Sequence, residues 1–462
     1  MTKIIAFLLL LSTLPLAGWR TDTQQKALVL RGLTIIDITG GPQKPDMTVV
    51  ITGNQITDLG EVGKVSVPQG GRVIDAGGKF LIPGLWDMHV HWYNKDTLTL
   101  FTANGVTGIR EMFGNSDLLR WRDEIAKGSL QGPRMVVASP IVDGPQPVWP
   151  NSISVRNEDE GRKAVTRVKQ WGADFVKVYS LLPREAYFGI ADEARKQGFP
   201  FEGHVPLTVS AAEASDAGQK SIEHLTGVIL ACSDKEAELR NERINANSPP
   251  ARPRAEVQAI ETFSDKKEAE LFARFIKNGT WQCPTLTVRR SAAYQDDPDF
   301  KNDGRLRFIP RQVLERWGMR MANRRAESYA NAKRLFQKEV EVVGDMRRAG
   351  VLLLAGTDTG NPFCFPGFSL HDELALLVKA GLTPAESLRA ATLNPAKFFG
   401  LDQKLGTIEQ GKLADLVLLE ANPLEDIRNT QRINAVIMNG RFYDRKALDK
   451  MLAQAQTIAN QR

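Results

Sequence analysis

The sequence predicts an α/β protein in which a (β/α)8 TIM barrel, at residues 81–401, is joined to a small β-sandwich domain. Three observations support this prediction. The chain has 462 residues, which is too long for one ordinary domain and suits a barrel with a smaller domain beside it. Its central part alternates short apolar runs with amphipathic stretches, and both of its ends carry β-type runs bounded by turn residues.

The central part contains eight candidate barrel strands. Helical stretches separate most of them, as at residues 157–171 and 183–197. The spacing is broken by two long, charged segments, 232–279 and 288–349, which we expect to lie over the top of the barrel, where active sites of this fold are found. The candidate strands are 81–90, 105–111, 134–139, 174–180, 199–204, 220–225, 280–286 and 351–358.

Both ends of the chain are expected to form one β domain. Alternating apolar residues bounded by Gly, Asn and Asp occur within residues 27–80 and return within residues 402–445. Segments with this pattern at both ends of a barrel can pair with each other. We therefore predict that residues 27–80 and 402–445 build the small domain together.

The first residues of the chain are typical of a secretory signal. Lys3 precedes a short apolar run that ends in small residues, so we expect residues 1–18 to be a signal peptide and the protein to be secreted or periplasmic. A short membrane anchor is the alternative, which the helix breaker Pro15 disfavours. No other stretch is apolar and long enough to span a bilayer.

Charge and cysteine content narrow the classes of partner. The net charge is +6, and no basic run is interleaved with aromatic residues, so nucleic acid is not an expected partner. The three cysteines, Cys232, Cys283 and Cys364, can form one disulfide at most, and free buried thiols are the equal alternative. The sequence leaves open whether the chain forms a homo-oligomer.

Six residues with metal-binding or acid–base chemistry lie in or at the ends of the candidate strands. His89 and His91 share one face of the first strand, because alternate strand residues point the same way. The carboxyl ends of barrel strands meet at one mouth, so the other members should join them there. These others are Lys177 in the fourth strand, His204 ending the fifth, His224 ending the sixth and Asp358 ending the eighth.

Such a set favours a site for divalent metal ions. Neutral imidazole and carboxylate are the ligands of zinc and related ions. A single histidine at a strand end would more often be a core residue with satisfied hydrogen bonds. Four histidines and an aspartate at strand ends would need an independent explanation for each one, so a metal site explains the pattern better.

Several of these motifs resemble the amidohydrolase superfamily. The segment PGLWDMHVH at 83–91 looks like its first-strand metal motif, and GTDTG at 356–360 looks like its eighth-strand aspartate motif. Residues 371–401 and 405–423 resemble its C-terminal stretch, so the likeness covers residues 28–445. It is strongest for the binuclear branch with a carboxylated lysine, which includes prolidase-like enzymes and N-acyl amino acid hydrolases.

The resemblance implies a role for each of the six residues. His89, His91 and Asp358 would bind one ion, and His204 and His224 would bind the second. Lys177 would react with carbon dioxide, and its carbamate would bridge two divalent ions, expected to be zinc; the alternative is an interior lysine paired with an acid. Asp358 would be the catalytic residue that transfers the proton.

The implied activity is that of a metal-dependent hydrolase. A metal-bridging hydroxide would cleave a C–N amide or peptide bond in a small substrate, such as an Xaa-Pro dipeptide or an N-acyl amino acid. Two alternatives remain: a lactonase, esterase or phosphotriesterase that uses the same site, and a catalytically inactive secreted binding protein. Retention of every ligand type disfavours the inactive protein.

Four further residues are candidates for substrate contact. Tyr179 lies two residues beyond Lys177 on the same strand face. Arg289 and Arg290 follow the seventh strand and could bind a substrate carboxylate, although a solvated loop is the alternative for both. His371 could contact substrate at the barrel mouth or make only local bonds at the start of a helix.

Overall fold

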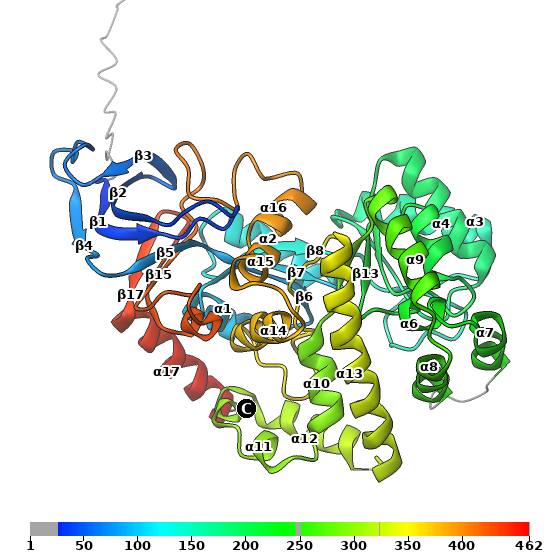
Figure 1. Ribbon diagram of the computed structural model, residues 1–462. Helices are drawn as coiled ribbons and strands as arrows, with labels where there is room; N and C mark the ends of the chain where they lie inside the picture. The colour runs from blue at the N-terminus through cyan, green and yellow to red at the C-terminus, as the bar shows by residue number, and fades with distance from the viewer. Residues whose placement is uncertain (1–25, 246–250, 323, 462) are drawn as a thin grey trace, which may run out of the picture.

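The computed structural model describes residues 26–245, 251–322 and 324–461, shown in Figure 1. The predicted signal peptide, residues 1–18, lies outside the described residues. Within the described part of the chain, no helix combines the length and the apolar character that a membrane span requires.

The barrel strands form two parallel sheets whose order follows the chain, except that β10 pairs on the outer side of β9. The first is β6-β7-β8, and the second is β10-β9-β11-β12-β13-β14. The strands are β6 (Leu85–Val90), β7 (Val106–Glu111), β8 (Arg134–Val137), β9 (Val142–Asp143), β10 (Ile153–Ser154), β11 (Val176–Val178), β12 (Phe201–Gly203), β13 (Ser221–Glu223) and β14 (Trp281–Cys283).

Backbone hydrogen bonds join the two sheets at both of their open sides. Between β8 and β11, the amide of Ser139 donates to the carbonyl of Phe175. On the other side, residues 351–359 run between β14 and β6 and bond to both. The predicted eighth strand thus occupies the expected place in the barrel, but it pairs only through isolated bridges at Leu353 and Thr359.

The predicted first barrel strand divides at Gly84. Its first half, β5 (Phe80–Pro83), belongs to the terminal sheet, the sheet built from both ends of the chain, where it pairs with β1 (Leu28–Ile35) and β15 (Leu416–Leu419). The barrel strand β6 begins only at Leu85, so the predicted barrel start at residue 81 is too early. A Cβ atom at Gly84 would lie 2.2 Å from Oγ1 of Thr107, which explains why only glycine fits at this junction.

The two ends of the chain build one β domain, as predicted, and its strands form a single hydrogen-bonded sheet. The order is β17-β16-β15-β5-β1-β2-β3, with β4 on β1. The strands are β1 (Leu28–Ile35), β2 (Lys44–Thr52), β3 (Gln55–Glu61), β4 (Arg72–Asp75), β15 (Leu416–Leu419), β16 (Ile433–Met438) and β17 (Arg441–Asp444).

Alternation along these strands divides their side chains between two cores. Leu416 and Leu418 pack with Leu30 and Val49 in the core of the small domain. The intervening Val417 packs into the main core of the barrel. The period of two along a strand therefore attaches the terminal sheet to the barrel.

Helices surround the barrel and extend it (Figure 1). The sequence did not predict α17 (Arg445–Gln461), which packs on α1 (Thr99–Ala103) and η2 (Gly304–Phe308). The helices outside the two long segments are η1 (Lys95–Thr97), α1 (Thr99–Ala103), α2 (Ser116–Ala126), α3 (Glu158–Trp171), α4 (Arg184–Gln197), α5 (Ala211–Asp216), α14 (Phe368–Lys379), α15 (Pro384–Ala390), α16 (Leu393–Phe398) and η3 (Ile427–Gln431).

The two long segments are helical, as expected. Segment 232–279 holds α7 (Glu236–Asn245), α8 (Ala251–Glu261) and α9 (Asp265–Asn278), after the short α6 (Val228–Ala231). Segment 288–349 holds most of α10 (Leu286–Tyr294), then α11 (Pro298–Lys301), η2 (Gly304–Phe308), α12 (Arg311–Met321) and α13 (Ala326–Ala349). The three cysteines are buried and unpaired, so free thiols rather than a disulfide are present.

Candidate active site

Three of the predicted ligands meet at the carboxyl end of β6. The Nε2 atoms of His89 and His91 lie 3.3 Å apart, and they lie 3.5 and 3.3 Å from Oδ1 of Asp358. Ligand atoms that bind one zinc ion tetrahedrally at about 2.1 Å lie roughly 3.4 Å from each other. The spacing of these three atoms therefore fits a divalent ion.

His204 and His224 complete a cluster of imidazoles. The ring centroids of His89 and His224 lie 4.4 Å apart, and those of His204 and His224 lie 5.0 Å apart. Nε2 of His224 is 3.9 Å from Oδ2 of Asp358. Asp358 thus lies between the two predicted ligand groups and offers one oxygen to each side.

Each histidine of this cluster has a polar partner at Nδ1 that orients its ring. Nδ1 of His224 is 2.6 Å from Oγ1 of Thr285, and Nδ1 of His204 is 2.9 Å from Oγ of Ser180. A hydrogen bond at Nδ1 fixes the tautomer and directs Nε2 toward an ion.

Lys177 is the buried lysine of the cluster. Its side chain is fully buried in β11, and its Nζ atom has no hydrogen-bond partner among the described residues. A buried ammonium without a partner is costly, and burial lowers the pKa of Lys177 to about 8. The lowered pKa favours the neutral amine, which is a nucleophile.

Burial also shifts the titration of the other members of the cluster. It raises the pKa of Asp358 to about 7, which the charge of Lys177 opposes. It lowers the pKa of His91 to about 3 and that of His89 well below its usual value. His89 and His91 are therefore neutral, which is the form that binds a cation.

Comparison with known families and structures agrees with this geometry. The sequence profile of the Amidohydrolase family matches residues 80–442, which is most of the chain. The chain belongs to the amidohydrolase family. It is accordingly a hydrolase that acts on carbon–nitrogen bonds.

Individual relatives of this amidohydrolase are distant. The ochratoxinase of Aspergillus niger is 26% identical over 381 residues, which cover 77% of this chain and 73% of the relative. Bottromycin amidohydrolase has a similar structure, with a TM-score of 0.76, 23% identity and coverage of 93% and 90% of the two chains. A crystal structure of a putative prolidase from Bifidobacterium longum has a TM-score of 0.68 and 24% sequence identity, and the match covers 93% of this chain and 99% of the prolidase.

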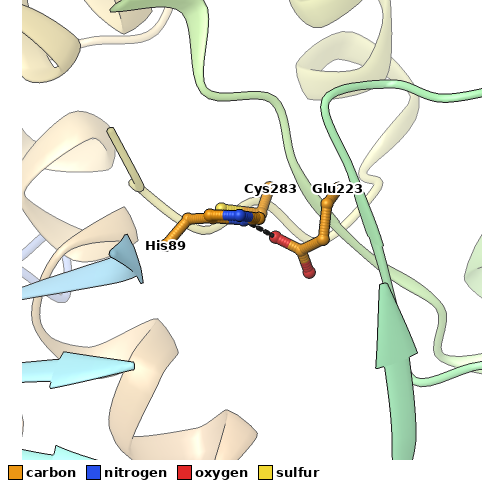
Figure 2. A group of neighbouring side chains, drawn as sticks. All are labelled: His89, Glu223 and Cys283. Carbon is orange, nitrogen blue, oxygen red and sulfur yellow. Dashed lines mark hydrogen bonds and ion pairs between the residues drawn. The ribbon is translucent and has the colours of Figure 1, made fainter. Parts of the chain in front are cut away.

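The sequence did not reveal that Glu223 supports the first histidine of this amidohydrolase. Figure 2 shows the Glu223 carboxylate beside the ring of His89, and its Oε2 atom lies 2.7 Å from Nδ1. Cys283 lies in the same group, but burial raises the pKa of its thiol well above the usual value. We interpret Glu223 as the residue that orients His89 and not as a ligand of a separate metal.

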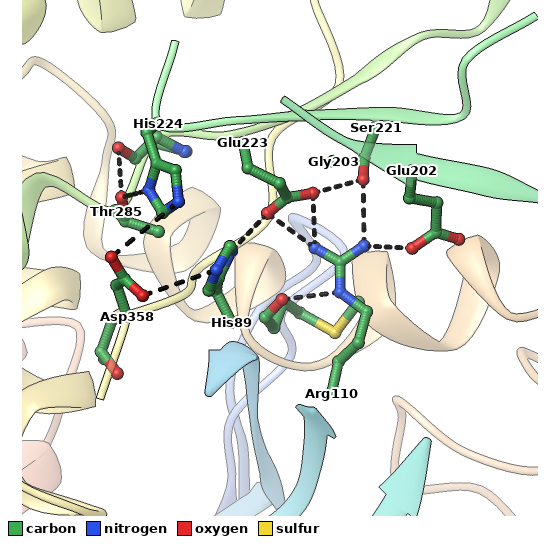
Figure 3. Close-up of polar contacts among 12 residues, drawn as sticks. His89, Arg110, Glu202, Gly203, Ser221, Glu223, His224, Thr285 and Asp358 are labelled. Carbon is green, nitrogen blue, oxygen red and sulfur yellow. Dashed lines mark hydrogen bonds and ion pairs between the residues drawn. The ribbon is translucent and has the colours of Figure 1, made fainter. Parts of the chain in front are cut away.

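Arg110 holds Glu223 in place, as Figure 3 shows. Its guanidinium donates to both Glu223 oxygens at 2.9 and 3.0 Å and to Glu202 at 2.6 Å. All three side chains are buried. The one available signal was that charged residues stood within or beside predicted buried strands, where a charge needs a partner.

The backbone takes unusual conformations at the site. His224 and Asp358 have φ values of 57° and 58°, which place both in the left-handed region that side chains disfavour. Gly203 has a φ of 135°, and a Cβ there would lie 2.2 Å from the carbonyl of Val178 and 3.1 Å from Cδ of Lys177. Glycine at this position allows β12 to approach Lys177 closely.

A pocket of about 650 Å³ opens onto the cluster, which suits a small molecule. Tyr179 lines it, stacks on His204 with centroids 4.0 Å apart, and accepts a hydrogen bond from Trp149, and its contact with substrate stays a prediction. Within the described residues, segment 288–349 contributes to the wall of this pocket, whereas segment 232–279 does not. Of the two segments expected over the top of the barrel, only 288–349 reaches this pocket among the described residues.

Three predicted substrate contacts have other partners. Arg289 lines the pocket but donates to Glu339 at 2.8 Å, and Arg290 pairs with Asp372 at 3.5 Å outside the pocket wall. Both lie in α10 and not in a solvated loop, since the chain becomes helical directly after β14. His371 is buried. Its Nδ1 atom lies 2.9 Å from Oγ1 of Thr430, and its Nε2 atom lies 3.0 Å from the carbonyl oxygen of Asn104. It therefore bonds within the core and does not reach the pocket.

Proposed function

We propose that this amidohydrolase binds two divalent metal ions, expected to be zinc, and cleaves an amide or peptide bond in a small substrate with a free carboxylate. The observation that supports the proposal most strongly is the spacing of 3.3–3.5 Å among the ligand atoms of His89, His91 and Asp358. His89, His91 and Asp358 would hold one ion, and His204 and His224 the second.

Lys177 is proposed to bridge the ions as a carbamate. Its buried, unpartnered Nζ and its pKa of about 8 favour reaction of the neutral amine with carbon dioxide. The product would place a negative, two-oxygen group where an ammonium would be repelled by cations. The space around Lys177 depends on Gly203, which leaves room beside its side chain.

The chemistry divides between the ions and the protein. Bound divalent ions would supply an ionised water at neutral pH and polarise the substrate carbonyl. Asp358 would accept the proton at a carboxylate oxygen and deliver it to the leaving nitrogen, because its Oδ1 atom lies within 3.5 Å of the Nε2 atoms of His89 and His91 at the centre of the cluster. Proton delivery matters because an amine anion is a poor leaving group.

The substrate class is proposed from the pocket and from relatives. A volume of about 650 Å³ suits an Xaa-Pro dipeptide or an N-acyl amino acid and excludes a folded protein. Structural neighbours include an Xaa-Pro dipeptidase, with a TM-score of 0.66, whose name describes cleavage of the bond before proline.

We also propose that the protein is exported to the periplasm or the medium, because residues 1–18 resemble a secretory signal.

Metal analysis and a substrate panel test the proposal. The purified enzyme should contain about two divalent ions per chain, and it should hydrolyse dipeptides or N-acyl amino acids faster than lactones or phosphotriesters. His91→Ala should lose metal and activity, whereas Asp358→Asn should keep much of its metal and lose kcat by about a thousandfold or more. Short carboxylic acids should partly restore the activity of the Lys177→Ala variant. Full activity after complete chelation of metal would refute the proposal.

A further inference from the structure

Two arginines of α12 face the pocket from the side of segment 288–349. Arg316 and Arg320 are four residues apart on this helix, so they lie one turn apart on the same face. Both line the cavity that His91 and Asp358 also line. The sequence analysis did not single out either residue.

These arginines differ from their neighbours in lacking a carboxylate partner. Within residues 26–245, 251–322 and 324–461, neither one forms an ion pair, whereas Arg289 is bound to Glu339 and Arg311 to Glu315. The guanidinium of Arg320 donates to the side-chain amide oxygen of Asn361 at 3.2 Å. It lies 5.7 Å from the ring centroid of Trp149. Neither of these two contacts is with a carboxylate.

The charge of the pocket wall is therefore positive. Asp358 is the one acidic residue among the described residues that line it. Three arginines line the same wall, and only Arg289 of these is neutralised by an acid. A wall of this kind attracts an anion.

Trp317 fixes α12 relative to the cluster. Trp317 lies between Arg316 and Arg320 in the sequence. Its ring is buried, and its Nε1 donates to the carbonyl of Gly360 at 3.2 Å. Gly360 lies two residues after Asp358. The ring also packs against Phe363, with centroids 5.9 Å apart. The arginine face of α12 is thus attached directly to the loop that carries the proton-transferring carboxylate.

We propose that Arg316 and Arg320 bind the carboxylate of the substrate, the role that the sequence had suggested for Arg289 and Arg290. Two guanidinium groups one turn apart can each offer paired N–H donors to carboxylate oxygens. The aromatic wall between α12 and the cluster, which includes Trp149 and Tyr179, covers the apolar part of the substrate. This proposal rests on the proposed function, because it assumes that a C–N bond lies at the histidine cluster.

Matched acidic and neutral substrates test the proposal in the metal-loaded enzyme. We would measure KM for N-benzoylglycine and for N-benzoylglycinamide with Arg316→Gln, Arg320→Gln and the double variant. Each single change should raise KM for the acid about five- to tenfold and alter KM for the amide by less than about twofold. Raising salt from about 50 to about 300 mM should raise the wild-type KM for the acid alone.

Arg311→Gln is the matched control on the same helix. Arg311 is exposed, pairs with Glu315 and is absent from the pocket wall, so its loss should leave both KM values unchanged. Equal changes in KM for the acid and the amide in the Arg316 and Arg320 variants would overturn the proposal. A wild-type preference for the neutral amide would overturn it as well.

Binding of an inert acid separates this proposal from the proposed function. Hydrocinnamate has no C–N bond, and hydrocinnamyl alcohol is its neutral analogue, so calorimetry with both reports binding without hydrolysis. If wild type hydrolyses no amide but Arg316→Gln and Arg320→Gln still weaken hydrocinnamate about fivefold or more, the carboxylate site stands and the proposed function fails. If amides are hydrolysed and hydrocinnamate binds the variants as tightly as wild type, the carboxylate site fails alone.

Discussion

Replacing Glu223 with Gln tests whether the buried Arg110–Glu223–His89 network holds the metal ligands. The change keeps the shape of the side chain and removes its charge. In the unsubstituted protein, Glu223 accepts hydrogen bonds from Nδ1 of His89 at 2.7 Å and from Arg110 at 2.9 and 3.0 Å, and all three side chains are buried. Removing one partner of a buried charge pair costs about 3–5 kcal/mol. Loss of the residue that orients a ligand lowers metal affinity about 10- to 100-fold.

Glu202→Gln is the matched control for this prediction. Glu202 is also buried and also pairs with Arg110, at 2.6 Å, whereas the carboxylate that bonds to His89 is that of Glu223. Both variants should lower the free energy of unfolding in chemical denaturation. Only Glu223→Gln should also lose metal at lower chelator concentration. If Glu202→Gln released metal as readily, or if Glu223→Gln kept wild-type affinity, the orienting role of Glu223 would be refuted.

Two further predictions concern the backbone and the pH dependence of stability. Gly203→Ala should lower the free energy of unfolding by about 2–4 kcal/mol and reduce kcat, because its Cβ would meet the carbonyl of Val178. The control Gly198→Ala should lower it by only about 1 kcal/mol, because Gly198 has a positive φ but open space around it. Equal losses in the two variants would contradict the steric argument. Burial raises the pKa of Glu373 from 4.5 to about 7, so between these values the native state binds more protons than the unfolded state and stability falls as pH rises, by on the order of 3 kcal/mol. Relative to wild type, Glu373→Gln should therefore gain free energy of unfolding as pH increases through this window, and a difference that does not change with pH would contradict the reasoning.

Sequence periodicity predicted much of the fold, but it could not locate every boundary. A continuous apolar run across Gly84 looked like one strand, because periodicity within a run does not show which sheet each half joins. Only the pairing partners of β5 and β6 divide it between the terminal sheet and the barrel. The eighth strand was placed correctly, and its weak pairing depends on neighbours that are distant in sequence.

The sequence by itself determined which residues gather at the mouth of the barrel. Strand-end positions converge in a parallel barrel, so His89, His204, His224 and Asp358 could be assigned to one site from local pattern alone. Tertiary structure decided which charges remain available there. Arg289 is neutralised by Glu339, fifty residues further along the chain, whereas neither Arg316 nor Arg320 forms an ion pair within the described structure. Ion pairing acts over a few ångströms in space, and sequence order does not encode those distances.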